Sequence, residues 1–364
     1  MSVPYRIDGV ITLLSPFHFA TQEVRTLFSN KEAKFPGVAM TGIIAPDGTK
    51  GLVPIYSGNS ARSFMRHLLS AQVISRIGGL TPVSQEAYYG LMHGGAETGL
   101  AEAPVELKQK ARKHPLVGLF GGGPYMIKGS LRASNWIPVG PVTSHLVPQH
   151  YQIHAAKEVP EDEKAKWPEY RDTMFWTKTD SLMSGNVDLD LIEGGAQGVQ
   201  EKIEAYASNK SAGTDERNPH RNTQNTEFVI PGTRMYLCYE AGPETGDVGA
   251  GVLLLGLQAF FQRQRLGGKE AIGFGKFGIN AASDVRFYSP HSETSEPVFD
   301  YVPASINSLP SYKLNPVLEQ RYIAPARAAL EAFSKADIDY FFTVPAAKQR
   351  PKKASKGADA AAAA

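Results

Sequence analysis

Hydrophobic and polar residues alternate along four segments of the chain, which predicts four β-strands, and two other segments have the spacing of buried helices. The predicted strands cover residues 5–14, 126–139, 227–240 and 277–287. The predicted helices cover residues 56–69 and 248–266. The order strand, helix, strand, strand, helix, strand is typical of the ferredoxin-like or RRM-like βαββαβ arrangement, so we expect an α+β fold.

Long segments between these elements predict insertions. Residues 17–52 are expected to form a turn-rich connection, and 78–123 short helices separated by glycines. Residues 145–226 form the largest expected insertion, with a polar helix near 199–207 and a loop at 210–225 that has no hydrophobic period.

Composition excludes several classes of protein. With 42% hydrophobic and 20% charged residues in 364, the chain is expected to fold into a globular protein. The single cysteine, Cys238, excludes a disulfide framework and a multi-cysteine zinc site, and it fits a reducing compartment. The first residues lack the pattern of a signal peptide, and the longest apolar stretch, 252–257, is too short to span a bilayer. We therefore expect a cytoplasmic protein.

The net charge of +2 is too small to indicate nucleic-acid binding by itself, so the positions of the charges matter more than their sum. Ser57 or Asn59 can cap the first predicted helix. Arg62 and Arg66 lie four residues apart on one face of that helix. Such a pair either contacts an anion or is ordinary solvated surface, and the sequence leaves both interpretations open.

The segment after the second predicted helix is rich in glycine. Gly273, Gly275 and Gly278 match a dinucleotide-binding fingerprint, but that fingerprint follows a strand, whereas this segment follows a helix. We therefore interpret the segment as a flexible loop in which Lys269 and Lys276 add positive charge near exposed backbone N–H groups. A purely structural turn between helix and strand is an equally good interpretation.

Three segments match known motifs in order and separation. Residues 58–66 contain Gly-Asn-Ser followed by two arginines, 119–122 read Leu-Phe-Gly-Gly and lead to a strand at 129–135, and 267–278 form the glycine-rich loop. Together they resemble the RAMP superfamily, the RNA-binding subunits of class 1 CRISPR effector complexes, over roughly residues 4–290. Within that superfamily the chain looks most like the backbone subunit of type IV complexes.

The resemblance implies a ferredoxin-like palm with large helical finger and thumb insertions. It implies the following division: residues 1–77, first part of the palm; 78–123, helical finger; 124–144, palm strand; 145–226, insertion with the thumb at about 179–226; 227–290, second part of the palm; 291–345, C-terminal helical region; 346–364, disordered basic and alanine-rich tail.

The resemblance also implies a role, which is to hold a guide RNA by its sugar-phosphate backbone and to multimerise along it. The implied RNA-binding residues are His18, Ser57, Gly58, Asn59, Ser60, Arg62, Arg66, Lys128, Arg132, Lys269, Gly273, Gly275 and Lys276. The implied thumb residues are Met183, Lys210, Arg217, His220 and Arg221. A half-buried structural role is at least as good an interpretation of His18.

The implied partners are a guide RNA, a target nucleic acid (DNA is favoured) that pairs with the guide, other copies of the chain arranged head to tail, and other effector subunits. A helicase is a further candidate partner. We expect no membrane, no cofactor and no catalytic residue.

Two other functions are weighed against this one. His145, His150 and His154 match no compact metal-binding spacing. Asp47 lies where some relatives carry an aspartate that cuts target RNA, which gives a metal-dependent ribonuclease as the alternative, although Pro-Asp-Gly is first of all a turn sequence. A small-ligand binder that uses the glycine-rich loop is the third hypothesis.

Overall fold

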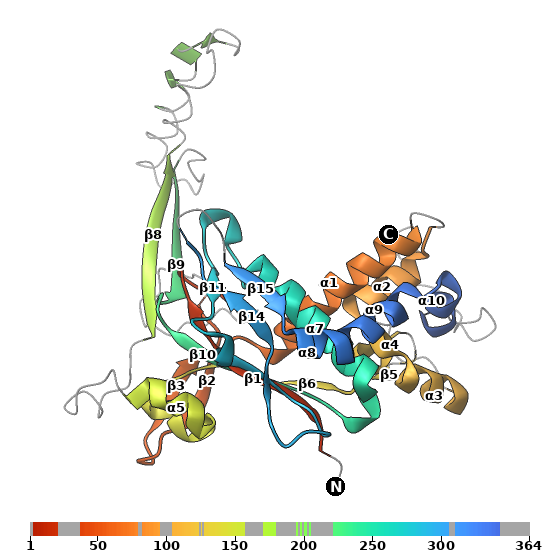
Figure 1. Ribbon diagram of the computed structural model, residues 1–364. Coiled ribbons are helices and arrows are strands. Elements are labelled where there is room, and N and C mark those ends of the chain that lie inside the picture. Colours follow the sequence, from red (N-terminus) through yellow and green to blue (C-terminus); the bar gives the residue numbers. More distant parts are fainter. Residues whose placement is uncertain are drawn as a thin grey trace, which may run out of the picture.

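The fold is built around one antiparallel sheet with β1 (Tyr5–Leu13) near its middle (Figure 1). The computed structural model describes residues 3–20, 37–78, 82–94, 104–123, 125, 127–156, 170–179, 194–195, 197–198, 200–201, 204, 221–305 and 310–342. On one side β1 pairs with β10 (Arg234–Ala241), which pairs in turn with β6 (Leu131–Ala133) and β7 (Ile137–Pro138). On its other side β1 pairs with β11 (Phe277–Gly278) and β12 (Val285–Tyr288), and β12 pairs with β13 (Glu296–Pro297).

Two long helices cover one face of this sheet. Helices α1 (Gly58–Gly78) and α7 (Gly246–Arg263) pack against each other, with the Phe64 and Phe260 rings 5.3 Å apart. Side chains that point to this face from β1, such as Ile7 and Ile11, are fully buried in the main hydrophobic core. The alternation in β1 therefore has its expected cause, and the predicted α+β class is confirmed.

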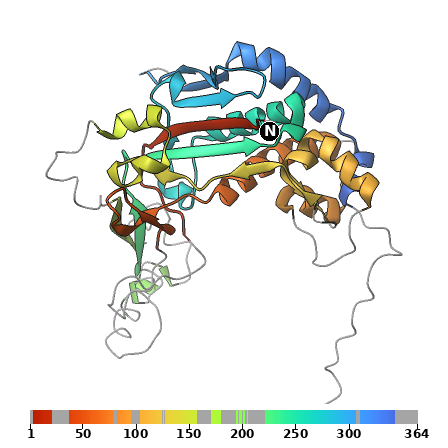
Figure 2. The ribbon, with the colours of Figure 1, turned by 90° about the horizontal axis from the view of Figure 1, so that it is seen from below.

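The opposite face of the sheet is covered by α5 (Gln149–Ala156), which follows a short 3-10 helix at Pro141–Leu146. The Tyr151 hydroxyl donates a hydrogen bond of 3.0 Å to Asp8 Oδ1. Asp8 is fully buried and forms an ion pair with Arg6 at 2.5 Å, which compensates part of the cost of burying its charge. In Figure 2, α5 lies at one end of the sheet and the orange helical region at the other.

The helical region comprises α2 (Gln85–His93), α3 (Val105–Lys113) and α4 (Pro115–Phe120), followed by the β4–β5 hairpin (Gly121–Gly122 and Ile127–Lys128). The C-terminal helices add to it: α8 (Pro316–Leu318), a π-helical turn at Glu319–Ile323, α9 (Ala324–Glu331) and α10 (Lys335–Phe342). Short helices between glycines were expected in 78–123, and the described part of that segment has them. No helix in the described ranges is both long and apolar enough to cross a membrane.

Three hairpins were not predicted. They are β2–β3 (Met40–Ile44 and Lys50–Pro54), β8–β9 (Arg171–Thr179 and Arg221–Val229) and β14–β15 (Phe299–Val302 and Ser311–Leu314). The first lies within the segment predicted to be a turn-rich connection. The β8–β9 ribbon rises away from the rest of the chain (Figure 1).

Three of the four strand predictions were wrong in extent. The segment 126–139 forms three short strands, β5, β6 and β7, of which β5 pairs with β4 outside the main sheet. The segment 277–287 contains β11, a 3-10 helix at Ala282–Asp284 and most of β12. The segment 227–240 is not a single strand but the end of β9 and most of β10, separated by a turn at Pro231-Gly232. Gly232 has a φ of 87°, in the region that favours glycine, and the turn ends β9 before β10 joins the main sheet. The loop predicted at 210–225 is also corrected at its end, because residues 221–225 belong to β9.

Candidate nucleic-acid interface

The N-terminus of α1 lies directly against the loop that follows β6. The Gly58 N–H donates to Asn135 Oδ1 at 3.0 Å. A Cβ at residue 58 would lie 2.2 Å from the Ala133 carbonyl oxygen, so only glycine allows this approach. Caps from Ser57 or Asn59 were expected, and the side chain that accepts from the first helical N–H is Asn135. The helix N-terminus is thereby fixed beside a strand that carries its own cation, Arg132.

Five cationic side chains from four elements surround one open groove of about 1080 Å³ beside this helix. They are Arg62 and Arg66 from α1, Arg112 from α3, Lys128 from β5 and Arg132 from β6. Asn59 and the Ser130 segment also line the groove. A smaller adjoining hollow is lined by Ser57, Asn59, Arg62, Arg132 and Asn135. The structure therefore brings six of the thirteen predicted RNA-binding residues, listed in the sequence analysis, to one place.

The two arginines of α1 are not ordinary solvated surface. Both donate to the Phe120 carbonyl oxygen, and Arg66 also donates to the Gly121 carbonyl at 2.8 Å. Burial, together with the neighbouring charge of Arg62, lowers the pKa of Arg66 to about 10. Burial alone lowers the pKa of Arg62. Their charges are thus partly removed from water, at a free-energy cost that an anion in the groove would reduce.

The charges of the groove are unbalanced. Glu244 is the one carboxylate among the residues that line it, and no salt bridge involves the five groove cations within the described residues. The Arg62 Nε is buried and has no hydrogen-bond partner there. Two guanidinium groups that share one carbonyl leave N–H donors for further acceptors. This arrangement suits phosphate oxygens, which guanidinium groups bind in a fork.

The glycine-rich loop has a different construction. A Cβ at Gly275 would lie 1.9 Å from the Leu266 carbonyl oxygen, and one at Gly267 would lie 2.5 Å from the His18 carbonyl oxygen. Both glycines have a positive φ. At these two positions glycine is required by the turn itself. Gly273 also has a positive φ, of 91°, but nothing lies within 4 Å of its Cβ position. Lys276 is exposed, and Lys269 is half-buried.

His18 lies beneath this loop. Its side chain is 5% exposed, and its Nδ1 lies 2.7 Å from the Glu227 carbonyl oxygen. Burial is the main cause that lowers its pKa, which keeps the ring neutral near pH 7. The structural interpretation of His18 fits this environment better than direct contact with a ligand.

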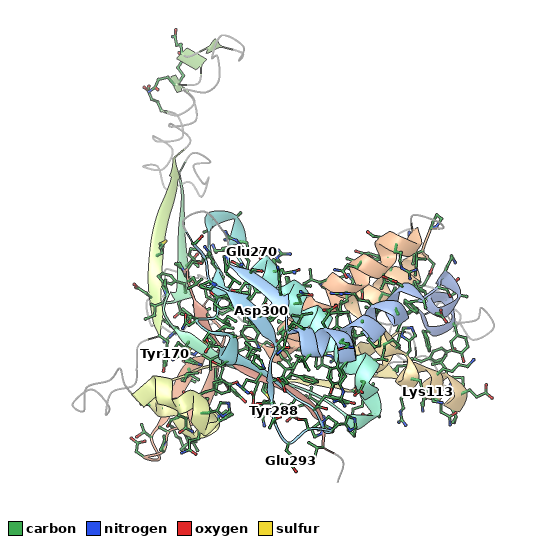
Figure 3. All side chains as sticks on the ribbon, in the orientation of Figure 1. Lys113, Tyr170, Glu270, Tyr288, Glu293 and Asp300 are labelled. Carbon is green, nitrogen blue, oxygen red and sulfur yellow. The ribbon has the colours of Figure 1, made fainter. Side chains whose placement is uncertain are left out.

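The glycine-rich loop is connected to α1 through neighbouring side chains. Arg263 forms an ion pair with Glu270 of the loop at 2.7 Å, and its guanidinium lies 5.0 Å from the Phe64 ring of α1. Burial raises the pKa of Tyr56, the residue that precedes Ser57, and the charge of Glu270 adds to this effect. In Figure 3, Glu270 is labelled on the upper side of the molecule, and Lys113, at the end of α3, lies on the lower right.

The predicted thumb residues are not brought into this site. Met183, Lys210, Arg217 and His220 lie outside the described residues. Arg221 begins β9 rather than lying in a loop, which corrects its expected setting. Its side chain is outside the described part of the chain. Gly58 and Ser60 are on α1, where Gly58 is buried and Ser60 is half-buried.

Sequence reasoning missed Arg112 and His93, which also line the groove. Arg112 belongs to the run Lys-Gln-Lys-Ala-Arg-Lys at 108–113, and this basic run just before the Leu-Phe-Gly-Gly motif was the available signal. His93 ends α2 and gave no signal in the sequence, because a lone histidine has many uses.

The alternative catalytic residue, Asp47, caps a turn. Its Oδ1 accepts a hydrogen bond of 2.8 Å from the Thr49 N–H, and the bonds from Thr49 lower the Asp47 pKa. Within the described residues no three His, Cys, Asp or Glu side chains lie close enough together to hold a metal ion. The side chain of His154 is outside that set.

Comparison with known proteins gives structural likeness alone. No family model and no curated protein matches the chain. The chain is similar to a chain of a structure described as "Type IV-B CRISPR Complex", with 16% identity, 81% of this chain and 94% of that chain covered, and a TM-score of 0.46. It is also similar to a chain of the Type III-B Cmr-beta complex bound to cognate target RNA, with 9% identity, 79% and 62% covered, and a TM-score of 0.36. Neither likeness assigns a role to a residue.

Proposed function

We propose that this chain binds a guide RNA through its sugar-phosphate backbone and multimerises along it as the helical backbone of a type IV-like effector complex. The observation that carries the proposal is the groove in which Arg62, Arg66, Arg112, Lys128 and Arg132 converge with one carboxylate among them. A polyanion with regularly spaced phosphates meets the electrostatic demand of such a groove.

The architecture supports the same proposal. Four strands of the main sheet correspond to the predicted βαββαβ order, and they lie side by side as β12-β1-β10-β6. Neighbouring strands are antiparallel, and α1 and α7 cover one face. In our proposal this unit is the ferredoxin-like palm, α2 to α4 belong to the finger insertion, and the β8–β9 ribbon leads into the thumb. The groove lies where palm and finger meet, so both can hold one strand.

Groove chemistry favours binding that is independent of base identity. The groove donors are guanidinium, ammonium and amide groups that suit phosphate and ribose oxygens. A guide held by its backbone would present its bases for pairing with a target strand, which we take to be DNA. Further copies would bind head to tail, because each copy must repeat the same contact along the guide.

The salt dependence of RNA binding tests the proposal. Replacing both Arg62 and Arg66 with alanine is expected to lower the slope of log affinity against log salt by about 0.7 for each lost phosphate contact, equally for all RNA sequences. Lys50→Ala with Lys313→Ala is the matched control, because it removes the same charge from exposed positions on β3 and β15. An unchanged slope in the arginine variant, or a loss that depends on sequence, would contradict the proposal.

We further propose that the chain is not a catalyst. The turn-capping bond of Asp47 supports this. Guide-paired RNA should remain intact when the assembled complex is incubated with Mg²⁺ or Mn²⁺. Cutting that disappears in Asp47→Ala would favour the ribonuclease alternative instead.

A further inference from the structure

A cluster of aromatic rings stands on the surface next to the cationic groove. Tyr88 and Tyr89 of α2 are 41% and 58% exposed, and their ring centroids lie 5.5 Å apart. The ring of His93, which is also exposed, lies 6.2 Å from Tyr88 and 5.8 Å from Tyr89. Two adjacent tyrosines that leave this much ring surface in water need an explanation, because aromatic side chains are usually more deeply buried.

This aromatic cluster is continuous with the groove. His93 lines the groove, and Gly94, the next residue, ends α2 with a φ of 65°. A Cβ at residue 94 would lie 1.5 Å from Arg66 Nη1, so Arg66 rests directly on the end of α2. On its other side His93 packs against His67 of α1, with ring centroids 5.1 Å apart. A strand whose phosphate contacts Arg66 would therefore have its neighbouring base beside these rings.

We propose that Tyr88, Tyr89 and His93 form a stacking platform that takes an unpaired nucleobase of the RNA strand whose phosphates lie in the groove. The proposal rests on the proposed function. It extends that function, because the groove alone would bind the RNA backbone and leave every base equally free. Aromatic rings stack with any base, since every base has a π face, so the platform would hold a base without reading its identity.

The position of the rings favours a base over a protein partner. The rings share His93 with a groove whose charges are unbalanced toward the positive, so the nearest expected occupant is the anionic strand itself. The edge-to-face arrangement of Tyr88 and Tyr89, with an interplanar angle of 74°, leaves a ring face free to accept a flat group.

A short single-stranded RNA with one 2-aminopurine, moved position by position along the strand, tests the platform in the full-length protein. Stacking on tyrosine should quench its fluorescence at one position for each bound subunit. Tyr88→Leu combined with Tyr89→Leu should abolish that quenching and weaken binding about 10-fold, since one base–aromatic stack contributes roughly that much. Phenylalanine at both positions should restore both signals, which a role limited to tyrosine hydroxyl groups would not allow.

Tyr340→Leu is the matched control, because Tyr340 of α10 is 40% exposed and lies away from the groove lining. It should leave quenching and affinity unchanged. Wild-type protein that binds RNA with no quenched position would overturn the platform and leave the proposed function intact. Normal quenching in the double leucine variant together with loss of subunit association would also overturn it, because the rings would then face another copy. Absence of any RNA binding by the wild-type protein would overturn both proposals.

Discussion

The cationic groove and the glycine-rich loop were both predicted to hold phosphate, yet they are built in opposite ways. In the groove, Arg62 and Arg66 are partly buried and held by the Phe120 carbonyl, so their charges are fixed and partly desolvated. In the loop, Lys276 is exposed and two of the glycines are required by the turn. Desolvated, fixed charges interact more strongly with an anion than solvated, mobile ones.

This difference shows that a glycine-rich motif and an arginine pair do not indicate a phosphate site equally well. Gly267 and Gly275 have a sufficient structural cause, which is their close approach to the carbonyl oxygens of His18 and Leu266. The arginines have no such sufficient cause, because two cations on one carbonyl repel each other. We therefore assign the larger share of RNA affinity to the groove.

The largest expected effect concerns the loop glycines and separates structure from binding. Gly275→Ala should lower the free energy of unfolding by roughly 3–5 kcal/mol, from a left-handed backbone and a clash with the Leu266 carbonyl. Gly273→Ala should cost about 1–2 kcal/mol, because only the backbone conformation opposes it. Urea unfolding measures both. Equal losses would show that the loop is not held as described.

Acidification should destabilise α3 and α4, which contribute residues to the groove, more than it destabilises the glycine-rich loop. His114 joins α3 to α4, and burial lowers its pKa to about 4 from an ordinary value of 6.5. The folded state favours the neutral His114 ring. The free energy of unfolding is therefore at its full value above pH 6.5 and decreases as the pH falls toward 4. The loss is at most about 3 kcal/mol.

His114→Gln should flatten this pH dependence, because glutamine does not titrate. Amide hydrogen exchange localises the effect when rates are divided by the intrinsic exchange rate at each pH, with lower protection expected in α4 at pH 5 than at pH 7 in the wild-type protein. An unchanged slope in the variant would mean that other groups cause it.

Two single substitutions compare the regions in RNA binding. Arg66→Ala should weaken affinity roughly 30-fold, because it removes a partly desolvated charged donor. Lys276→Ala should weaken it about threefold, as expected for an exposed charge. Filter binding at one fixed salt concentration measures both. A larger effect at Lys276 would reverse the comparison and give the loop the main role.

Local patterns predicted the centre of the fold. The alternation in β1 and the apolar run of α7 each reflect burial that a short segment reveals by itself. Strand pairing between segments far apart in the sequence gave no such local pattern. Residues 222–225 read Asn-Thr-Gln-Asn and show no apolar alternation, so the strand they form could not be recognised without its partner β8.

The candidate site was partly predictable for the same reason. The spacing of Arg62 and Arg66 placed them on one helix face, but their contact with the Phe120 carbonyl depends on how α4 packs. Arg112 and His93 joined the groove only through that packing. The sequence could suggest which cations matter, whereas their desolvation required the three-dimensional arrangement.

Glu227 gives the ribbon of β8 and β9 a mechanical property. Its carboxylate pairs with Arg171 at 2.5 Å and accepts the Val38 N–H at 2.6 Å, while its carbonyl oxygen lies against His18. Next to it, Phe228 packs on Phe274 of the glycine-rich loop at 6.0 Å. The base of the β8–β9 ribbon is therefore held by the contacts of Glu227 and Phe228. A tilt of the ribbon would change the contact of Phe228 with the glycine-rich loop first.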